Sequence, residues 1–382
     1  MRRLKIYSFF IFIQSFLYAQ DTLEARRIIQ FLCSDNCYGR GYLNNGLQNA
    51  EKYIVGEVKK NKGQMIFEKS YTQTFYQNLN TFPKNIQVKI NGKSLLVGRD
   101  FIPNPGSNSI KGTFTLSKKD SVHYSGAAHD QMVSVVIKKK LTFSVAHEVK
   151  PIAEIEIDQK TVSNEPKEIE IKIKNKLIKH FKSNNIGCYI AGQTNSDSCI
   201  VFSAHYDHLG GIGKNCYFPG ANDNASGVSM VLSLLKYYAQ HPPKYKCVFL
   251  FFAGEEAGLL GSKAFVESNS FDLKKIKFLI NLDLLGTGQD GIMVVNGAIH
   301  EKEFEILNQI NQQKQLLKQI KKRGKAANSD HYWFSEAGVP CFFIYTMGGI
   351  SAYHDIYDIE KTLPLSAYQN VFTLITEFIS KQ

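Results

Sequence analysis

The chain has 382 residues, of which 43% are hydrophobic and 21% are charged, and its formal net charge at pH 7 is +12. A chain of this length can bury a sizeable core and can hold one large α/β domain together with a smaller unit. Basic residues are spread along the chain, with short clusters at 138–140 and 321–323. Because no basic face carries stacking aromatic residues, we expect no nucleic acid partner.

The first 19 residues have the pattern of a secretory signal peptide. Arg2, Arg3 and Lys5 precede an apolar stretch over residues 6–17, and a small residue follows it. Polar residues interrupt this short stretch, so we expect no stable membrane span. The pattern predicts that this segment is removed and that the protein is exported to the periplasm or the cell exterior.

The seven cysteines are an odd number for an exported chain. Two of them lie inside apolar runs of the second half and are expected to be small buried hydrophobic residues. Cys33 and Cys37 flank a polar turn, and an oxidising compartment would allow them to pair. A bridge between Cys188 and Cys199 is a second alternative.

The first half of the chain changes from a helical to a β-like pattern. Apolar spacing predicts helices over 22–32 and 46–62, with a turn at Gly39-Arg40-Gly41 between them. From residue 76 to 166 the segments are short, and Asn91-Gly92 gives a two-residue hairpin signal. We interpret this region as a β-rich insertion or lid.

In the second half, apolar strand-like runs alternate with helical patterns. This alternation predicts an α/β fold with a mainly parallel mixed sheet that helices cover on both faces. Three of the runs end in residues that can bind metals, namely His205, the pair Glu255-Glu256, and Asp283. Open α/β sheets bind ligands at the carboxyl ends of their strands, so we expect these side chains to meet.

The pattern of donors indicates a metal site. Zinc takes nitrogen from His and oxygen from Asp or Glu, and a two-metal site needs a carboxylate that spans both ions. The sequence offers five candidate ligands on strand ends or adjoining loops: His205, Asp223, Glu256, Asp283 and His354.

The expected organisation has four parts. They are a signal peptide over 1–19, an N-terminal helical part of the main domain over 20–75, the β-rich insertion or lid over 76–166, and the α/β part with the candidate metal ligands over 167–382. We expect the insertion to contact the substrate entrance and to contribute no metal ligand.

Several motifs occur in the order in which a known family carries them. They are HYDHLG over 205–210, GANDNASG over 220–227, GEEAG over 254–258, NLDLLG over 281–286 and SDH over 329–331, followed by His354 and Asp358. These motifs closely resemble the exported co-catalytic zinc aminopeptidases, a family that also contains glutaminyl cyclases, glutamate carboxypeptidases and the transferrin receptor. The resemblance covers residues 168–382 well, and it covers 76–166 only as a place where members carry insertions.

The resemblance implies two Zn²⁺ ions per chain. His205 and Asp283 would hold one zinc, Glu256 and His354 would hold the other, and Asp223 would bridge them. Members of the family also have a cis peptide bond after the bridging aspartate, which predicts a cis bond after Asp223.

The resemblance also implies catalytic roles. Glu255 would be the general base, which takes a proton from a metal-activated water and gives it to the leaving amine. Asp207 would orient the imidazole of His205. Further orienting candidates are Ser329, Asp330 and Asp358, whereas structural and functional roles remain open for His208 and His331.

The chain departs from the family at three positions. Asp355 follows the last ligand histidine, where many members have a hydroxyl residue, and Thr287 stands where many have arginine. Ala326 stands where some members have a tyrosine that polarises the scissile carbonyl. If a tyrosine does that work here, Tyr345 and Tyr353 are the candidates.

The leading functional hypothesis is hydrolysis of N-terminal residues from peptides with a free N-terminus, with a broad or apolar preference. A glutaminyl cyclase-like acyltransferase is one alternative, although the Asn-Ala-Ser-Gly continuation over 224–227 is unusual for it. A catalytically silent, receptor-like binding module is another, although such a module need not keep all five ligands and the base. A carboxypeptidase remains open, because the same metal centre serves both ends of a peptide.

Overall fold

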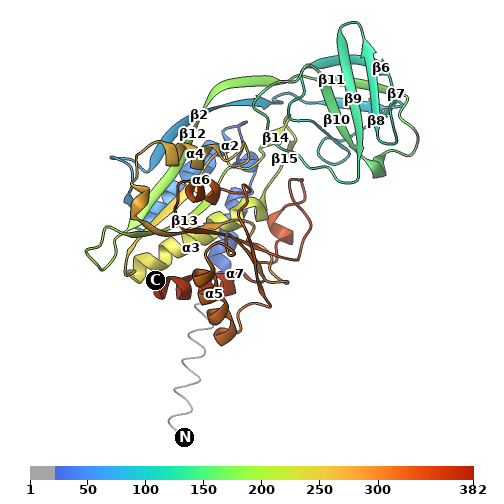
Figure 1. Ribbon diagram of the computed structural model, residues 1–382. Helices are drawn as coiled ribbons and strands as arrows, with labels where there is room; N and C mark the ends of the chain where they lie inside the picture. Colours follow the sequence, from blue (N-terminus) through green and yellow to red (C-terminus); the bar gives the residue numbers. More distant parts are fainter. Residues whose placement is uncertain (1–21) are drawn as a thin grey trace.

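A computed structural model describes residues 22–382, so the expected signal peptide lies outside the described residues. Among residues 22–382, every helix is too short or too polar to cross a lipid bilayer. Figure 1 shows two parts, a larger one built around a central sheet and a smaller β-rich one beyond the end of two long strands.

Within the described residues, the larger part contains a nine-stranded sheet in the order β1-β12-β16-β13-β17-β20-β18-β19, with β2 also paired to β12. The bounds are β1 Gln64–Met65, β2 Thr72–Thr81, β12 Lys176–Ile190, β13 Cys199–His205, β16 Lys246–Phe252, β17 Ile276–Leu282, β18 Ile292–Val295, β19 Ile320–Arg323 and β20 Cys341–Thr346. The four central strands, β16, β13, β17 and β20, are mutually parallel, while β12 and β18 pair with them in the antiparallel sense. The expected mixed, mainly parallel sheet is therefore confirmed.

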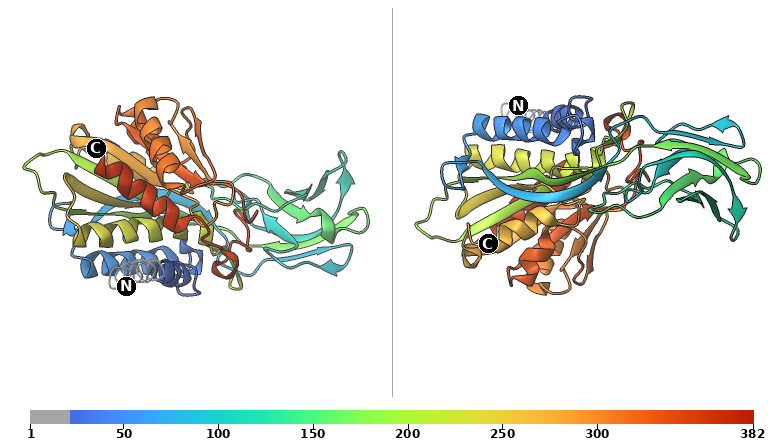
Figure 2. Two further views of the ribbon diagram at one scale, coloured as in Figure 1. Left: turned by 90° about the horizontal axis from the view of Figure 1, so that it is seen from below. Right: turned by 90° about the horizontal axis from the view of Figure 1, so that it is seen from above.

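Helices cover both faces of this sheet (Figure 2). They comprise a helix over 22–32, α2 Gly46–Lys60, α3 Gly227–Gln240, α4 Leu260–Glu267, α5 Glu301–Lys314, α6 His331–Glu336 and α7 Tyr368–Ser380. Side chains alternate between the faces of a strand, so Phe202 of β13 joins the core shared with α3 and α7, whereas Val201 packs with Phe265 of α4 and Phe334 of α6. Both faces of β13 are buried, as its continuous apolar sequence predicts.

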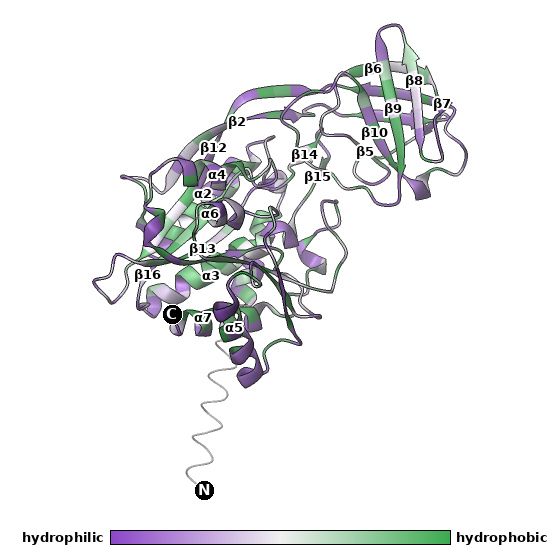
Figure 3. Cartoon of the chain, in the orientation of Figure 1, coloured by the Kyte–Doolittle hydropathy of each residue, from purple (hydrophilic) through white to green (hydrophobic). Residues whose placement is uncertain are grey.

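Hydrophobic residues concentrate in the central strands and in α3, while α5 is mostly hydrophilic (Figure 3). Short elements connect these parts: η1 Tyr38–Arg40, β14 Gly211–Ile212, β15 Cys216–Tyr217, the π-helical turn η3 Ala221–Ser226, η4 Leu273–Lys275 and η5 Glu360–Thr362. The turn η3 leads directly into α3, so it lies where the first helix after β13 begins.

The smaller part contains two further sheets among the described residues, with strand orders β5-β10-β9-β8-β7 and β4-β3-β11-β6. The bounds are β3 Gln87–Ile90, β4 Lys93–Ser94, β5 Phe101–Pro103, β6 Ile110–Thr115, β7 Ser117–Lys118, β8 His123–Ala128, β9 Gln131–Lys138, β10 Ala153–Asp158, η2 Gln159–Thr161 and β11 Glu168–Ile173. Residues of both sheets share one hydrophobic core. The expected Asn91-Gly92 turn joins β3 to β4, with positive φ at both residues.

The strands near the two ends of the expected insertion, 76–166, join different sheets. The whole of β2 pairs with β12 and belongs to the central sheet, whereas β11 pairs with β3 and β6 in the small unit. An alternating pattern predicts a half-buried strand but does not identify the sheet that the strand joins.

The seven cysteines all lie within the described residues, and all are free and buried. Neither of the bridges considered from the sequence is formed. Because β16 lies between β12 and β13, Cys188 and Cys199 are at least two strand spacings apart, roughly 9.6 Å, and they are also offset along the sheet, since Cys188 is opposite Phe249 and Cys199 is opposite Lys246. A disulfide needs Cα atoms within about 7 Å. Burial raises the pKa of Cys33 to about 12 and that of Cys37 to about 11, which suppresses the reactive thiolate.

These thiols give a direct test of the fold. In the native protein we expect no cysteine to react with a disulfide reagent such as DTNB within minutes, because every thiol is buried. In denaturant without reductant, all seven should react. A count of five in denaturant, rising to seven after reduction, would show that one bridge exists.

Candidate metal centre

The five candidate ligands meet at the carboxyl ends of the parallel strands. His205 ends β13, Glu256 follows β16, and Asp283 follows β17, while Asp223 comes from η3 and His354 from the loop after β20. In the central sheet, His205 lies opposite Phe252 of β16, which places the three strand ends side by side. Residues from five segments of the chain therefore converge at one edge of the sheet.

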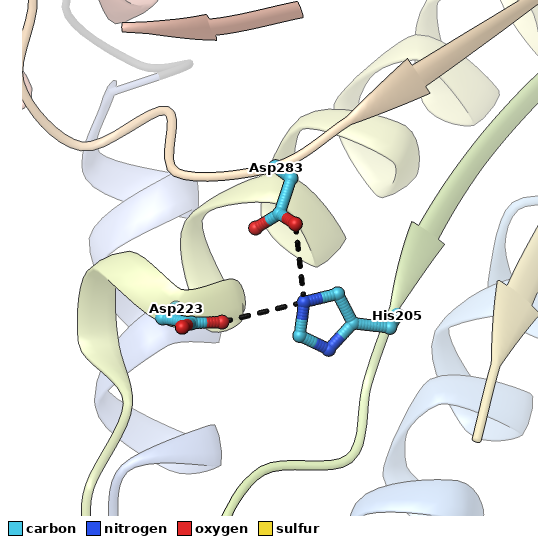
Figure 4. A group of neighbouring side chains, drawn as sticks. All are labelled: His205, Asp223 and Asp283. Atoms are coloured by element: carbon cyan, nitrogen blue, oxygen red, sulfur yellow. Dashed lines mark ion pairs between the residues drawn. The ribbon is translucent and has the colours of Figure 1, made fainter. Parts of the chain in front are cut away.

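Asp223 lies at the middle of this group. His205 Nε2 is 3.3 Å from Asp223 Oδ1 and 3.3 Å from Asp283 Oδ2 (Figure 4). His354 Nε2 is 3.1 Å from Asp223 Oδ2 and 3.2 Å from Glu256 Oε2. The two oxygens of Asp223 thus face two different histidines, which is the arrangement that a bridging carboxylate requires.

Burial and neighbouring charges shift the pKa values of these side chains in opposite directions. Burial lowers the pKa of His205, but the negative charges of Asp283 and Glu255 outweigh it and hold that pKa well above its usual range. Burial likewise raises the pKa of Glu256, but the positive charges of His354 and His208 bring it down to about 2. The lowered pKa of Glu256 shows that its carboxylate depends on positive charge close to it.

The donor set fits divalent cations. Among the described residues, two groups of three donors lie within 4.8 Å of one another: His205, Asp223 and Asp283, and His208, Asp223 and Glu256. Imidazole nitrogen and carboxylate oxygen are typical zinc ligands. Asp283 Oδ1 is buried without a hydrogen-bond partner, and a metal ion would satisfy it. Both groups contain Asp223, which is compatible with two metal positions that share it. The second group contains His208 and not His354, but His354 Nε2 also lies within 3.2 Å of an oxygen of Asp223 and of Glu256.

His208 also lies in this centre, although the sequence left its role open. Its Nδ1 is 2.6 Å from Glu256 Oε1 and 3.9 Å from Asp223 Oδ1. The rings of His208 and His354 meet edge to face, with centroids 5.8 Å apart. Because Glu256 presents one oxygen to each ring, His208 orients Glu256 from the side opposite His354.

Glu255 lines the same pocket as His205, Asp223 and Asp283, and it belongs to neither donor group. Its Oε2 is 4.0 Å from His205 Nε2. Burial raises the pKa of Glu255 well above its usual range, and the neighbouring charge of Glu256 adds to this against the opposing effect of His205. The carboxylate of Glu255 is therefore a group that can hold a proton.

Asp207 contacts both His205 and the backbone of Glu255. Its carboxylate accepts hydrogen bonds from the Tyr42 hydroxyl at 3.3 Å and from the Glu255 N–H at 3.2 Å. The His205 ring nitrogen Nδ1 lies 3.2 Å from the Asp207 carbonyl oxygen, and 3.8 Å from its carboxylate. The expected contact with His205 is thus made mainly through the backbone, and the carboxylate holds the Glu255 backbone instead.

Other orienting candidates divide into two sets. Asp358 accepts hydrogen bonds from the backbone N–H groups of Asn222 and Asp223, at 2.8 and 3.0 Å. Ser329 donates to Asp283 Oδ2 at 3.0 Å. Asp330 and His331 are buried nearby, but neither belongs to a donor group among the described residues.

Both candidate tyrosines line the pocket. The ring of Tyr353 stacks on that of His354, with centroids 4.0 Å apart and an interplanar angle of 12°. The remaining walls comprise Leu284, Asn328 and Phe343, and the pocket volume is about 190 Å³.

The backbone at Asp223 has the expected form, because the Asp223–Asn224 peptide bond is cis. Gly220 has φ 62°, and a Cβ there would collide with the Asp223 carbonyl, His208 and Arg40. Gly227 is equally confined, against Asn224 and the Leu282 carbonyl. Both glycines permit the close packing of η3 against its neighbours.

Arg40 is a site residue, although its sequence pattern, Gly39-Arg40-Gly41, predicts only a turn. It is fully buried, and its guanidinium donates five hydrogen bonds to backbone carbonyls. The acceptors are Tyr206 at 2.9 Å, Leu32 at 3.2 Å, Pro219 at 2.6 Å, Gly220 at 2.8 Å and Asp223 at 3.0 Å. Arg40 therefore ties the segment after His205 to the loop that carries Asp223. In the sequence, the one feature that could have drawn attention to Arg40 is its place between two glycines. In the structure, both glycines pack against the backbone of Gly210.

Comparisons with known proteins agree with this geometry. Residues 185–379 match the model of peptidase family M28. Aminopeptidase YwaD of Bacillus subtilis is 27% identical over 192 residues, which is 50% of this chain and 41% of that protein. A vacuolar membrane protease of Kluyveromyces lactis is 35% identical over 109 residues, which is 28% of this chain and 11% of that protein. This chain thus covers less than half the length of either curated relative.

Solved structures match over nearly the whole chain. A peptidase M28 precursor from Shewanella amazonensis SB2B has a TM-score of 0.69 at 12% identity, with 96% of each chain covered. BSAP, a zinc aminopeptidase from Bacillus subtilis, has a TM-score of 0.67 at 19% identity, with 94% of each chain covered. The fold that they share with this chain includes its β-rich part, because the coverage extends beyond the region that the family model matches.

We expect Arg40→Lys to weaken metal binding. Lysine offers three donors where arginine offers five, so at least two buried carbonyls lose their partner, at about 1–3 kcal/mol each. Zinc affinity should be measured by competition with a chelator, alongside thermal unfolding of the metal-free protein. Tyr38→Phe is the matched control, because Tyr38 lies in the same turn but donates to the carbonyls of Gly213 and Cys216. Equal zinc affinity in the two variants would contradict the role of Arg40.

Proposed function

Because the chain belongs to peptidase family M28, we propose that it is a zinc-dependent aminopeptidase that removes N-terminal residues from peptides with a free amino terminus. The observation that carries this proposal is the position of the Asp223 carboxylate, because one of its oxygens faces His205 and the other faces His354. The names of the relatives support the same activity, since one is an aminopeptidase and one matched structure is a zinc aminopeptidase.

In the proposed centre, Asp223 serves both metal positions. His205 and Asp283 complete one position, and Glu256 and His354 complete the other. When bound, two zinc ions would polarise the scissile carbonyl and make water a stronger nucleophile at neutral pH.

Glu255 is the proposed general base. It lines the pocket and is not one of the five proposed ligands, so its carboxylate is free to accept a proton from the attacking water and to deliver that proton to the leaving amine. Asp207 supports this role, because its hydrogen bond to the Glu255 N–H fixes the backbone from which the base projects.

The charges around the pocket favour an amino terminus over a carboxyl terminus. Glu255 lines the pocket and is not one of the proposed ligands, so its carboxylate is available to attract a substrate ammonium group. Among the described residues that line it, no lysine or arginine is present to pair with a terminal carboxylate. This distribution favours the aminopeptidase over the carboxypeptidase.

The pocket also bears on the size and type of the N-terminal residue. Its volume of about 190 Å³ is smaller than the roughly 300–1,000 Å³ of pockets that hold drug-sized ligands, and it suits one end of a peptide. Leu284, Phe343 and Tyr345 supply apolar walls, which favour apolar N-terminal residues. We further propose that the protein acts after export, on the basis of the signal pattern in its first 19 residues.

We expect Glu255→Gln to lower kcat by about 10²–10⁴-fold while two zinc ions remain bound, because the amide keeps the shape of the side chain but cannot take up the proton. Steady-state kinetics and metal analysis on the same sample provide the measurement. Glu267→Gln is the control, since Glu267 is an exposed carboxylate at the end of α4. Near-normal turnover in Glu255→Gln would remove this residue from the mechanism.

Substrate and metal requirements can be measured together. Leucine p-nitroanilide should be hydrolysed, and its N-acetylated form should not, because acetylation removes the positive charge that the Glu255 carboxylate attracts. Incubation with a chelator should abolish hydrolysis, and added zinc should restore it. Cleavage of the acetylated substrate would argue against an aminopeptidase, and release of pyroglutamate from a glutaminyl peptide would favour the cyclase instead.

A further inference from the structure

The connection between β9 and β10 extends from the small unit to the loop that carries His354. We call residues 139–147 of this connection the strap; it contains no helix or strand. Near its end, the Ala146 carbonyl accepts a hydrogen bond from the Asn80 N–H at 2.8 Å, and His147 Nδ1 lies 3.0 Å from the Asn78 carbonyl. The strap therefore lies along β2, between the small unit and the central sheet.

The strap holds the loop that carries His354. The Phe143 N–H donates to the His354 carbonyl at 2.9 Å. Lys140 Nζ donates to the Ser351 carbonyl at 2.8 Å and lies 3.2 Å from Asp355 Oδ2. These contacts fall on His354 itself, on its following neighbour and three residues before it.

Asp355 organises the same loop from within. Its Oδ1 accepts a hydrogen bond from the Tyr357 N–H at 2.9 Å, and its Oδ2 accepts one from the Tyr353 N–H at 3.4 Å. The charge of Asp355 is matched by that of Lys140 in the insertion, so an ion pair joins the loop to the strap.

The loop needs such support because it has little structure of its own. Residues 347–358 form no helix or strand, and His354 has φ 53°, in the left-handed region that side chains other than glycine rarely adopt. A residue in that region persists when its surroundings hold it there. The strap supplies part of those surroundings.

A second contact connects the strap to the loop that carries Asp223. The ring of Phe143 stacks on that of Phe218, with centroids 4.9 Å apart and an interplanar angle of 7°. Phe218 shortly precedes Gly220 and η3, and both phenylalanines belong to the core of the small unit. One segment of the insertion thus contacts the carriers of Asp223 and His354.

We propose that the strap makes the small unit a positioning device for the metal position formed by Glu256, His354 and Asp223, with Lys140 as the positioning residue. This proposal depends on the proposed function, in that this position must bind zinc. It also revises our expectation for the insertion. No strap side chain belongs to a donor group among the described residues, yet the strap holds the backbone of a candidate ligand.

The test compares Lys140→Met with Lys139→Met. The two changes remove the same charge at adjacent positions, and Lys139 makes no ion pair among the described residues. Zinc titration of the metal-free protein, with a competing chelator, should resolve two affinities. We expect Lys140→Met to weaken one of them about 5- to 10-fold, the size expected for a half-exposed ion pair with one charged hydrogen bond, and to leave the other unchanged.

Two further variants separate positioning from general stability. Lys140→Arg should restore the weakened affinity, because arginine can reach both acceptors. The double variant of Lys140→Met with Asp355→Asn should lose no more affinity than the more affected single variant, because the two residues act as one pair. Thermal unfolding of each metal-free variant confirms that it folds.

The outcomes distinguish this proposal from the proposed function. Wild-type protein that fails to bind two zinc ions or to hydrolyse leucine p-nitroanilide would overturn the proposed function. Wild-type protein that does both, together with Lys140→Met that binds both ions with unchanged affinities, would overturn only the role of the strap. An equal loss at both positions would also overturn it, because that result indicates a general effect on the fold.

Discussion

The arrangement depends on holding four carboxylates, those of Asp223, Glu255, Glu256 and Asp283, together in a buried space. Like charges at such distances repel strongly in a medium of low polarity, so the cluster persists only with cations among its members. The histidines supply part of that compensation, as the opposed pKa shifts of Glu256 and His354 indicate: proximity to the carboxylates raises the pKa of His354 to about 11 against burial. Metal ions would supply the remainder.

Two buried side chains of opposite charge hold the backbone of the loop around Asp223. Arg40 donates to the carbonyls of Gly220 and Asp223, while Asp358 accepts from the N–H groups of Asn222 and Asp223. Arg40 therefore binds the carbonyl groups of the loop, and Asp358 binds its N–H groups, so the two side chains fix different backbone atoms of the same loop. A regular helix would satisfy these groups internally, but it would not leave the Asp223 carboxylate between two histidines.

Much of the fold and the convergence of five side chains followed from the sequence, because both depend on local signals. Apolar runs that end in His205, Glu255 and Asp283 mark strand ends, and parallel strands bring such ends to one edge. The cis bond after Asp223 followed from the resemblance alone. The turn at Asn91-Gly92 was legible because its residue types are specific to one turn geometry.

What could not be predicted depends on contacts between distant segments. The acceptors of Arg40 include carbonyls more than 160 positions away in sequence, and an arginine between glycines looks the same whether it is exposed or buried. Lys140 and Asp355 are similarly distant, so neither charge indicates the other. Alternation of side chains also could not place β2 in one sheet and β11 in another, nor could the spacing of Cys188 and Cys199 reveal the strand between them.

The small unit begins and ends on β2 and β12, two strands that are paired neighbours from Thr72–Ile186 to Thr81–Lys176. In topological terms it is a very long hairpin loop, and the central sheet would be continuous without it. A loop of this kind can grow or shrink freely, since its two ends stay side by side whatever lies between them. The strap removes that freedom at one place, because a segment that must reach His354 has a fixed span. The small unit can therefore vary in length, but the strap must keep its contact with His354.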